Sequence, residues 1–310
     1  MTRLPTVVVS SVVRSAHQGE SHGGVYLVDL DARSHRQVVD WNAPGISWEG
    51  RGADRGLRGI AFWREHVLLA ASDELFVYDP KFQPVASYRG RYLKHCHEIC
   101  VGGDSVFLTS TGFDSVLVLD LPSGRFTAGF CLRRSTVRRQ LMFGKFDPNS
   151  DHGPPPGDTV HLNNVHYENG NLFVAGLGLQ RMFRLNGGGL EQVARIPPGT
   201  HNARPYRDGV LLNDTASDRV VYATREGEVL QAFPVARYPE QALMHSDLPS
   251  DHARQAFARG LCVTDGDVII AGSSPSTVSV YKLGEVESLA ALNLTMDVRN
   301  SIHGLEVWPF

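Results

Sequence analysis

Three histidines occupy the same position in alternate copies of an internal sequence repeat. The repeat is visible in six short segments, which begin at Arg58, His97, Asn163, His201, Arg259 and His303. If the six copies close into a ring, His97, His201 and His303 lie about 120° apart and converge on one axis. Imidazole nitrogens are common ligands of transition metals. The sequence therefore predicts a mononuclear metal site held by these three residues.

Such a site has a definite range of chemistry. Three neutral imidazoles leave coordination positions open for a substrate or dioxygen, which favours Fe(II), with Mn, Cu or Zn as alternatives. We expect an oxidoreductase or oxygenase acting on a small anionic substrate. A lyase or epimerase that uses the metal as a Lewis acid is the alternative enzyme. A non-catalytic protein that binds a ligand or another protein is the alternative to an enzyme.

The other three repeat positions carry Arg58, Asn163 and Arg259. A guanidinium can bind a carboxylate or phosphate in a bidentate manner, so the two arginines are expected to orient the substrate. Asn163 is expected to bind substrate or to act as a weak metal ligand. Salt bridges with neighbouring acidic residues, such as Glu98 or Glu306, are the alternative for the arginines.

Two further histidines precede the repeat positions by two residues, namely His95 and His161. In a strand, residues two apart point the same way, so these side chains are expected to lie above His97 and Asn163. Each is a candidate fourth ligand or catalytic proton carrier, and the alternative is an ordinary surface histidine.

A glycine-rich loop joins the first two expected strands, with the sequence His17-Gln-Gly-Glu-Ser-His-Gly-Gly24. Such loops allow close backbone approach to a ligand. His17 and His22 are expected to bind substrate, and Glu20 to act as general base or to orient a metal-bound imidazole. A polar hairpin tip is the alternative.

The elements that must position these residues are strands. Each copy contains short Val- and Leu-rich runs separated by Gly, Asp and Asn turns, with almost no helical periodicity. Four-stranded copies recurring about every 40 residues are typical of a β-propeller. Two longer intervals mark insertions at about 132–160 and 236–257.

The two ends of the chain complete the predicted fold. The N-terminal region supplies three strands that lack an innermost partner, and Ser301–Trp308 is an innermost strand that lacks the other three. Joining them gives a sixth blade and leaves no open sheet edge. We therefore predict an all-β, six-bladed β-propeller that forms a single domain over residues 1–310.

The amino-acid composition limits the kinds of binding partner that the protein is expected to have. The net charge is −3, so we expect neither nucleic acid nor an anionic membrane as a binding partner. No segment approaches the roughly 20 apolar residues of a membrane span, and the N-terminus is expected to form a strand and not a signal peptide. The four cysteines form no CxxC pair. A cytoplasmic location is expected.

Several of the repeated segments resemble a little-characterised family of bacterial propellers with CHE, HLN and RGL strings. The segments are His95-Cys-His-Glu-Ile, His161-Leu-Asn-Asn-Val, Thr200-His-Asn-Ala-Arg-Pro, Ala258-Arg-Gly-Leu and Ser301-Ile-His-Gly-Leu-Glu-Val-Trp. The resemblance implies the six-bladed fold but no particular activity. The fold is also distantly similar to strictosidine synthase and gluconolactonase propellers, whose acidic calcium site this chain does not share. In the use of histidines alone, the site is similar to carotenoid cleavage oxygenases and oligogalacturonate lyases.

Overall fold

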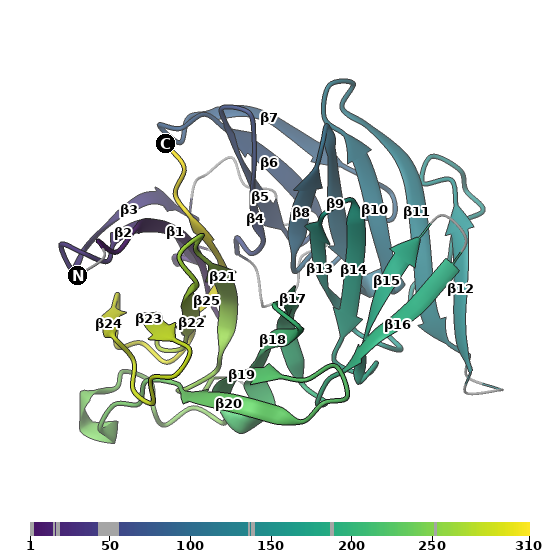
Figure 1. Ribbon diagram of the computed structural model, residues 1–310. Coiled ribbons are helices and arrows are strands. Elements are labelled where there is room, and N and C mark those ends of the chain that lie inside the picture. The colour runs from purple at the N-terminus through teal and green to yellow at the C-terminus, as the bar shows by residue number, and fades with distance from the viewer. Residues whose placement is uncertain are drawn as a thin grey trace. The chain divides into compact units, whose positions relative to one another are not determined.

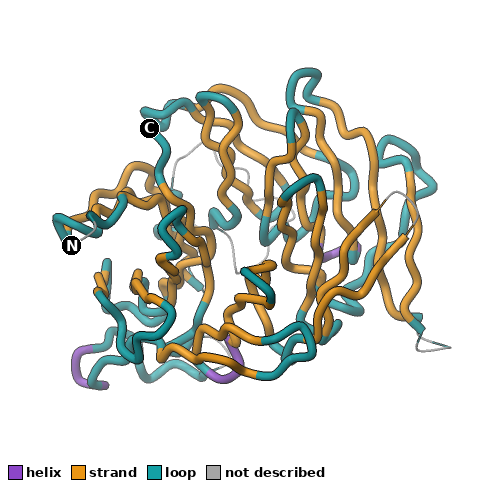
Figure 2. The backbone as a smooth tube through the Cα atoms, viewed as in Figure 1, coloured by secondary structure: helices purple, strands orange, loops and turns teal. Residues whose placement is uncertain are grey.

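The computed structural model describes residues 3–14, 16, 19–42, 56–135, 137, 140–186, 189–250 and 253–310. His17, one of the predicted substrate-binding residues, lies outside these ranges. Within them the chain is almost entirely strand, turn and loop (Figure 2). The helical segments described are three single turns of 3₁₀ helix: η1 (Thr111–Phe113), η2 (Thr215–Ser217) and η3 (Glu240–Ala242). None of the described helices has the length and apolar character needed to span a membrane.

The strands form six antiparallel sheets, and the fold class is that of a six-bladed β-propeller, as predicted (Figure 1). The chain also divides into two compact units. We call residues 1–58, 213–221 and 230–310 the terminal unit, and residues 59–212 and 222–229 the central unit. Each is described by itself, and the prediction of a single domain stays a prediction.

The terminal unit contains two complete sheets, with strand orders β25-β1-β2-β3 and β21-β22-β23-β24. Their strands are β1 (Thr6–Val13), β2 (Gly23–Asp29), β3 (Ser34–Asp40), β21 (Arg259–Val263), β22 (Val268–Ser273), β23 (Thr277–Lys282), β24 (Ala290–Asn293) and β25 (Asn300–Val307).

The central unit contains three complete sheets, in which the strands follow chain order. The first is β4 (Ile60–Trp63), β5 (His66–Ala71), β6 (Glu74–Tyr78) and β7 (Pro84–Arg89). The second is β8 (Ile99–Gly102), β9 (Ser105–Ser110), β10 (Ser115–Asp120), β11 (Arg125–Arg134) and β12 (Leu141–Phe146). The third is β13 (Leu162–Glu168), β14 (Asn171–Gly176), β15 (Arg181–Asn186) and β16 (Gly189–Arg195).

The remaining sheet has the order β17-β18-β19-β20, and the boundary between the two units passes through it. Its strands are β17 (Thr200–Tyr206), β18 (Gly209–Asp214), β19 (Arg219–Ala223) and β20 (Val229–Pro234).

The outermost strand of each sheet is more exposed than the second and third strands, and the sequence reflects this. β5 (HVLLAA) is buried along almost its whole length, whereas β7 (PVASYR) alternates exposed and half-buried residues. A strand covered on both faces reads as a continuous apolar run, and an outer strand that faces solvent can carry polar residues. The apolar runs of the sequence are therefore the second and third strands of the blades.

The chain termini share one sheet, as predicted. β25 pairs antiparallel with β1, with Val7 opposite Val307 and Val13 opposite Asn300. The side chains of Val7, Val9, Ile302 and Leu305 pack into one core cluster of the terminal unit. The last strand of the chain thus completes a blade begun by the first.

The first predicted insertion is partly regular structure. β11 extends to Arg134, and β12 pairs with it over Leu141–Phe146 as a fifth strand of that sheet. The proline-rich remainder, residues 147–158, contains no strand or helix, as expected for a loop. The second insertion contains only η3 among its described residues.

A short turn recurs between the second and third strands of two blades. η1 and η2 are each followed by an aspartate in the left-handed conformation, Asp114 and Asp218. The buried Asp114 carboxylate accepts hydrogen bonds from the Thr159 hydroxyl (2.6 Å) and the backbone amides of Thr159 (2.7 Å) and Val160 (3.1 Å). The turn therefore fixes the segment that leads into the innermost strand of the next blade, where the candidate residues lie.

Candidate functional site

Three of the six repeat positions lie at or beside irregularities in the innermost strands. The register shifts at Asn163 in β13, at Gly260 in β21, and at His303 and Gly304 in β25. A β-bulge breaks the alternation of a strand and turns a side chain in a new direction. In these three blades the repeat position therefore marks a bulge as well as a strand.

Hydroxyl groups from the second strands satisfy the backbone at or next to two of the repeat positions. Thr109 Oγ1 accepts from the backbone amides of His97 and Glu98, both at 3.0 Å. Ser10 Oγ accepts from the Gly304 amide at 2.9 Å in the terminal unit. Since buried amides require a partner, these hydroxyls stabilise the backbone at both positions.

Each of the three predicted metal ligands makes the same type of local hydrogen bond. In His97, His201 and His303, Nδ1 lies 2.9, 3.2 and 3.1 Å from the backbone carbonyl oxygen two residues earlier. A carbonyl can only accept, so Nδ1 carries the proton and Nε2 carries the lone pair. A hydrogen bond from Nδ1 to a carbonyl orients the imidazole so that Nε2 can bind a metal. The same hydrogen bond also orients Nε2 to accept a hydrogen bond from another side chain.

In the terminal unit, His303 accepts a hydrogen bond from an arginine. The distance from Arg259 Nη1 to His303 Nε2 is 2.5 Å, and both side chains are buried. Burial holds the pKa of His303 well below its usual range, and the charges of Arg259, Arg58 and Arg14 lower it further. His303 is therefore neutral, and three guanidinium groups lie within electrostatic reach of it.

In the same unit, three arginine side chains lie close to the ring of Phe257. The guanidinium carbons of Arg14, Arg259 and Arg254 lie 4.5, 4.6 and 5.0 Å from the centre of its ring. Cation–π attraction at this distance stabilises a guanidinium and limits its orientation. The sequence pointed to Arg58 and Arg259, but neither Arg14 nor Phe257 was predicted, because nothing in their local pattern marks them.

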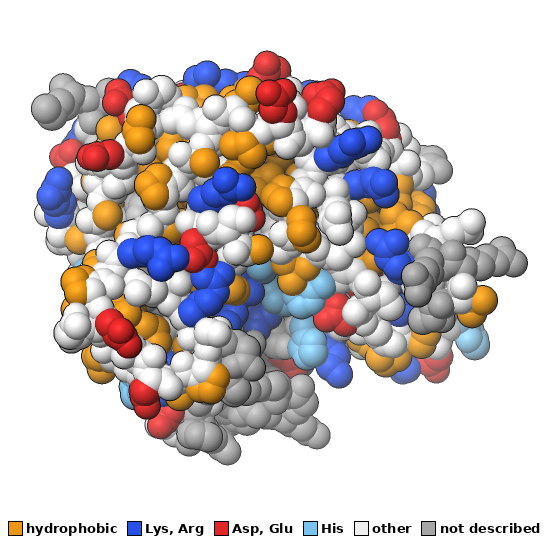
Figure 3. All heavy atoms as spheres, turned by 90° about the horizontal axis from the view of Figure 1, so that it is seen from below, with side chains coloured by type: hydrophobic (Ala, Val, Ile, Leu, Met, Phe, Trp, Pro, Cys, Tyr) orange, Lys and Arg blue, Asp and Glu red, His pale blue; other side chains and the backbone are white. Residues whose placement is uncertain are grey.

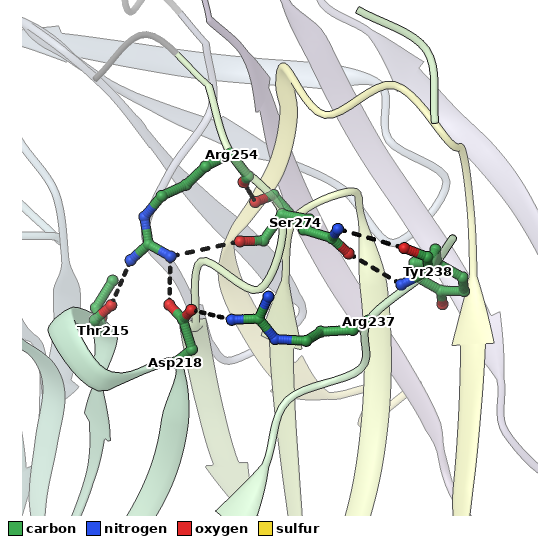
Figure 4. A network of polar contacts seen from close by, with 7 residues as sticks. Thr215, Asp218, Arg237, Tyr238, Arg254 and Ser274 are labelled. Atoms are coloured by element: carbon green, nitrogen blue, oxygen red, sulfur yellow. Dashed lines mark hydrogen bonds and ion pairs between the residues drawn. The ribbon is translucent and has the colours of Figure 1, made fainter. Parts of the chain in front are cut away.

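Arg254 belongs to a polar network that also includes Thr215, Asp218 and Arg237 (Figure 4). Its guanidinium pairs with Asp218 and donates to the Thr215 carbonyl at 2.6 Å. Asp218 also accepts from Arg237 at 2.5 Å. This network fixes the segment that leads into β21, in the same way that Asp114 fixes the segment before β13.

In the central unit, the side chain of Glu98 forms hydrogen bonds with residues of two other blades. Its carboxylate accepts hydrogen bonds from the side-chain amides of Asn164 (2.5 Å) and Asn202. The residues after the repeat positions of three consecutive blades therefore meet. Glu98 was predicted only as a salt-bridge partner for an arginine, and this asparagine pairing was not foreseen.

Asn163 itself is 3% exposed. Neither its amide nitrogen nor its amide oxygen has a hydrogen-bond partner in the part of the chain that the structure describes. Buried polar atoms without partners are rare, and a bound water, ion or ligand is a common explanation. The predicted role of Asn163 in binding fits this observation.

His161 and His97 lie side by side at the entry to two neighbouring innermost strands. Their ring centres are 5.2 Å apart at an interplanar angle of 60°. His161 Nδ1 lies 2.9 Å from the carboxylate of Asp158, a residue that the sequence did not mark. Histidine side chains gather on one face of the molecule (Figure 3).

The glycine-rich loop is only partly described. His22 is fully buried, and its carbonyl accepts from the Val13 amide at 3.1 Å. Glu20 is exposed, and its charge reaches Arg299. A substrate-binding role for His22 and a catalytic role for Glu20 and His95 stay predictions.

Among the described residues, no group of three or more His, Cys, Asp or Glu side chains is arranged to hold a metal ion. The predicted ligands divide between the units, with His97 and His201 in the central unit and His303 in the terminal unit. The three-histidine metal site therefore stays a prediction.

Comparison with known proteins supports the fold alone. No protein family model matches the sequence, and no curated protein matches it significantly. A protein of unknown function from Bacteroides caccae has a similar structure, with a TM-score of 0.58, 9% identity, and coverage of 97% of this chain and 98% of that one. Virginiamycin B lyase from Staphylococcus aureus matches with a TM-score of 0.41 and 11% identity over 74% of this chain and 71% of its own. At these identities the comparisons extend to the propeller architecture and no further.

Proposed function

We propose that this propeller binds a small anionic substrate, a carboxylate or a phosphate, through Arg14, Arg58 and Arg259. The observation that carries the proposal is the convergence of these guanidiniums on a neutral, buried His303. Arginine remains protonated in proteins, so the positive charge is permanent.

The low exposure of the cluster strengthens its attraction for an anion. Arg58 and Arg259 are 5% and 8% exposed. At an effective dielectric constant near 20, one unit charge 4 Å from another gains about 4 kcal/mol, compared with about 1 kcal/mol in water. A multiply charged group that reaches several guanidiniums is therefore favoured over a neutral one.

His303 and Phe257 orient the arginines for this task. His303 Nε2 accepts from Arg259 without adding a negative charge, so it directs the guanidinium and leaves its charge in place. Phe257 restricts Arg14 and Arg259 through its ring. Restricting the donors before the ligand arrives reduces the entropy lost on binding.

The experiment is a calorimetric titration of the full chain with inorganic phosphate and with oxalate. Arg259→Met and Arg58→Met are expected to weaken binding at least tenfold, on the order of 1.4 kcal/mol. Arg3→Met is the control, because Arg3 belongs to the same unit and its side chain is 84% exposed. Unfolding midpoints show that each variant is folded. Unchanged binding in both arginine variants, or no binding by the parent protein, would contradict the proposal.

A metal-dependent enzyme is the second candidate function. The Nδ1–carbonyl hydrogen bond of His97, His201 and His303 favours it, because it makes Nε2 of each ring the nitrogen that would coordinate a metal. In His303 the metal would replace the hydrogen bond that Nε2 accepts from Arg259. An oxygenase using Fe(II) is the first form of this proposal, and a lyase or epimerase using Mn, Cu or Zn is the second. Metal analysis of the purified protein tests it: stoichiometric metal that is lost in His201→Ala supports an enzyme, and metal-free protein argues against one.

A further inference from the structure

Two imidazoles of the central unit are arranged as a pair at the start of neighbouring blades. His97 precedes β8 and His161 precedes β13, and the 5.2 Å between their ring centres places them in edge-to-face contact. His161 retains a side-chain exposure of 31%, so the pair is accessible from solvent.

Hydrogen bonds determine the tautomer of both rings. His97 Nδ1 lies 2.9 Å from the His95 carbonyl and 2.9 Å from Thr111 Oγ1, whose own proton goes to the Leu162 carbonyl. His161 Nδ1 lies 2.9 Å from the Asp158 carboxylate. In both rings Nδ1 is therefore the donor, and Nε2 carries the lone pair.

The distance between the rings fits one shared metal ion. With metal–nitrogen bonds of about 2.1 Å, two imidazoles on a tetrahedral metal hold their ring centres about 5 Å apart. The carboxylate on Nδ1 of His161 and the carbonyl on Nδ1 of His97 are the partners that metal-binding histidines commonly have.

The backbone around the pair is strained in a repeated way. His95 and His161 occupy equivalent positions in their blades, and both adopt the left-handed conformation, with φ of 54° and 49°. This conformation costs a non-glycine residue about 1 kcal/mol or more and is often found at functional sites. Two residues after His161, the buried amide of Asn163 offers an oxygen with no partner among the described residues.

We propose that His97 and His161 bind a divalent transition metal through Nε2, with Asp158 and Thr111 as positioning residues and the Asn163 amide oxygen as a third donor. This set differs from the ring of His97, His201 and His303. It also lies wholly within the central unit, and it does not depend on anion binding at the arginines.

The test is titration of the metal-free full chain with ZnCl₂ by calorimetry and with CoCl₂ by its visible absorption, which reports coordination number. We expect one equivalent to bind. His161→Ala should weaken binding at least about 100-fold, and Asp158→Asn about 10- to 100-fold. His35→Ala is the control, because His35 is an exposed histidine outside the pair.

Three outcomes would overturn the proposal. One is no zinc or cobalt binding by the parent protein at millimolar metal. Another is binding that is unchanged in both His161→Ala and the more conservative His161→Gln, with unfolding midpoints showing that both are folded. The third is a loss in His303→Ala as large as that in His161→Ala, which would assign the metal to the three-histidine ring. Phosphate binding by the same preparations reports separately on the arginine site.

Discussion

At the scale of single residues, the candidate sites depend on histidines whose hydrogen-bonding roles are set by their surroundings. His303 is held neutral by burial and by three arginines, and His97 and His161 have the tautomer set by a carbonyl and a carboxylate. Residue type and spacing drew attention to these positions. For His303, the charges that help to keep the ring neutral come from side chains that are remote in sequence, such as Arg14 and Arg259.

In the central unit, the buried side chain of His166 allows the effect of histidine burial on the pH dependence of stability to be tested. Burial, followed by the charge of Arg204, lowers its pKa to about 3. Because the unfolded chain takes up this proton near pH 6.5, the contribution of His166 to stability is present above that pH and is lost as pH falls toward 3. At pH 5 the loss is about 2 kcal/mol.

We expect His166→Gln to lose less stability between pH 7 and pH 5 than the parent protein, by about 2 kcal/mol in urea unfolding. His35→Gln, which removes an exposed histidine, should behave like the parent. Equal pH dependence in His166→Gln and the parent protein would show that His166 does not titrate as described.

At the scale of elements, three innermost strands combine a repeat position with a bulge. Gly260 in β21 has a φ of +76° and occupies the extra position beside Arg259. An added Cβ would lie 3.0 Å from Leu305 Cβ and 3.1 Å from Ile302 Cγ2. Strand periodicity predicted the element, but periodicity contains no information about where the pairing slips.

Gly260→Ala is therefore expected to destabilise the protein by about 2–4 kcal/mol, from the left-handed backbone and from crowding. Gly284 is the matched control, because its φ is +88° and no atom lies within 4 Å of an added Cβ. Gly284→Ala should cost only about 1 kcal/mol. Chemical unfolding of both variants measures the difference, and equal costs would mean that packing around the bulge is unimportant.

At the scale of the whole molecule, six antiparallel sheets are built from one repeat, and one sheet takes strands from both ends of the chain. β25 is the innermost strand of that sheet, and it carries His303. Its Ile302 and Leu305 are 0% and 3% exposed. The C-terminal segment therefore contributes to both the core and the candidate anion site.

Removal of residues 300–310 is expected to abolish the folded state, because it exposes β1 along its length and removes a core strand from a protein whose total stability is on the order of 5–15 kcal/mol. Removal of Phe310 alone, which is 45% exposed, should change the unfolding midpoint little. Circular dichroism and thermal unfolding of the two truncated proteins show whether each one still folds. A cooperative transition in the longer truncation, at the parent temperature, would be inconsistent with this role of β25.

The sequence by itself determined most of the strands, the number of blades, the joining of β25 to β1 and the positions in each blade that carry polar side chains, but not the fifth strand β12. These features follow from alternation and spacing, which are local properties of a chain. The tertiary structure decided the bulges, the Arg14 and Phe257 contacts, the Asp158–His161 pair, and Glu98 as the partner of Asn164 and Asn202. Strand register and the charge state of a buried group depend on neighbours far away along the chain, so no local pattern contains them.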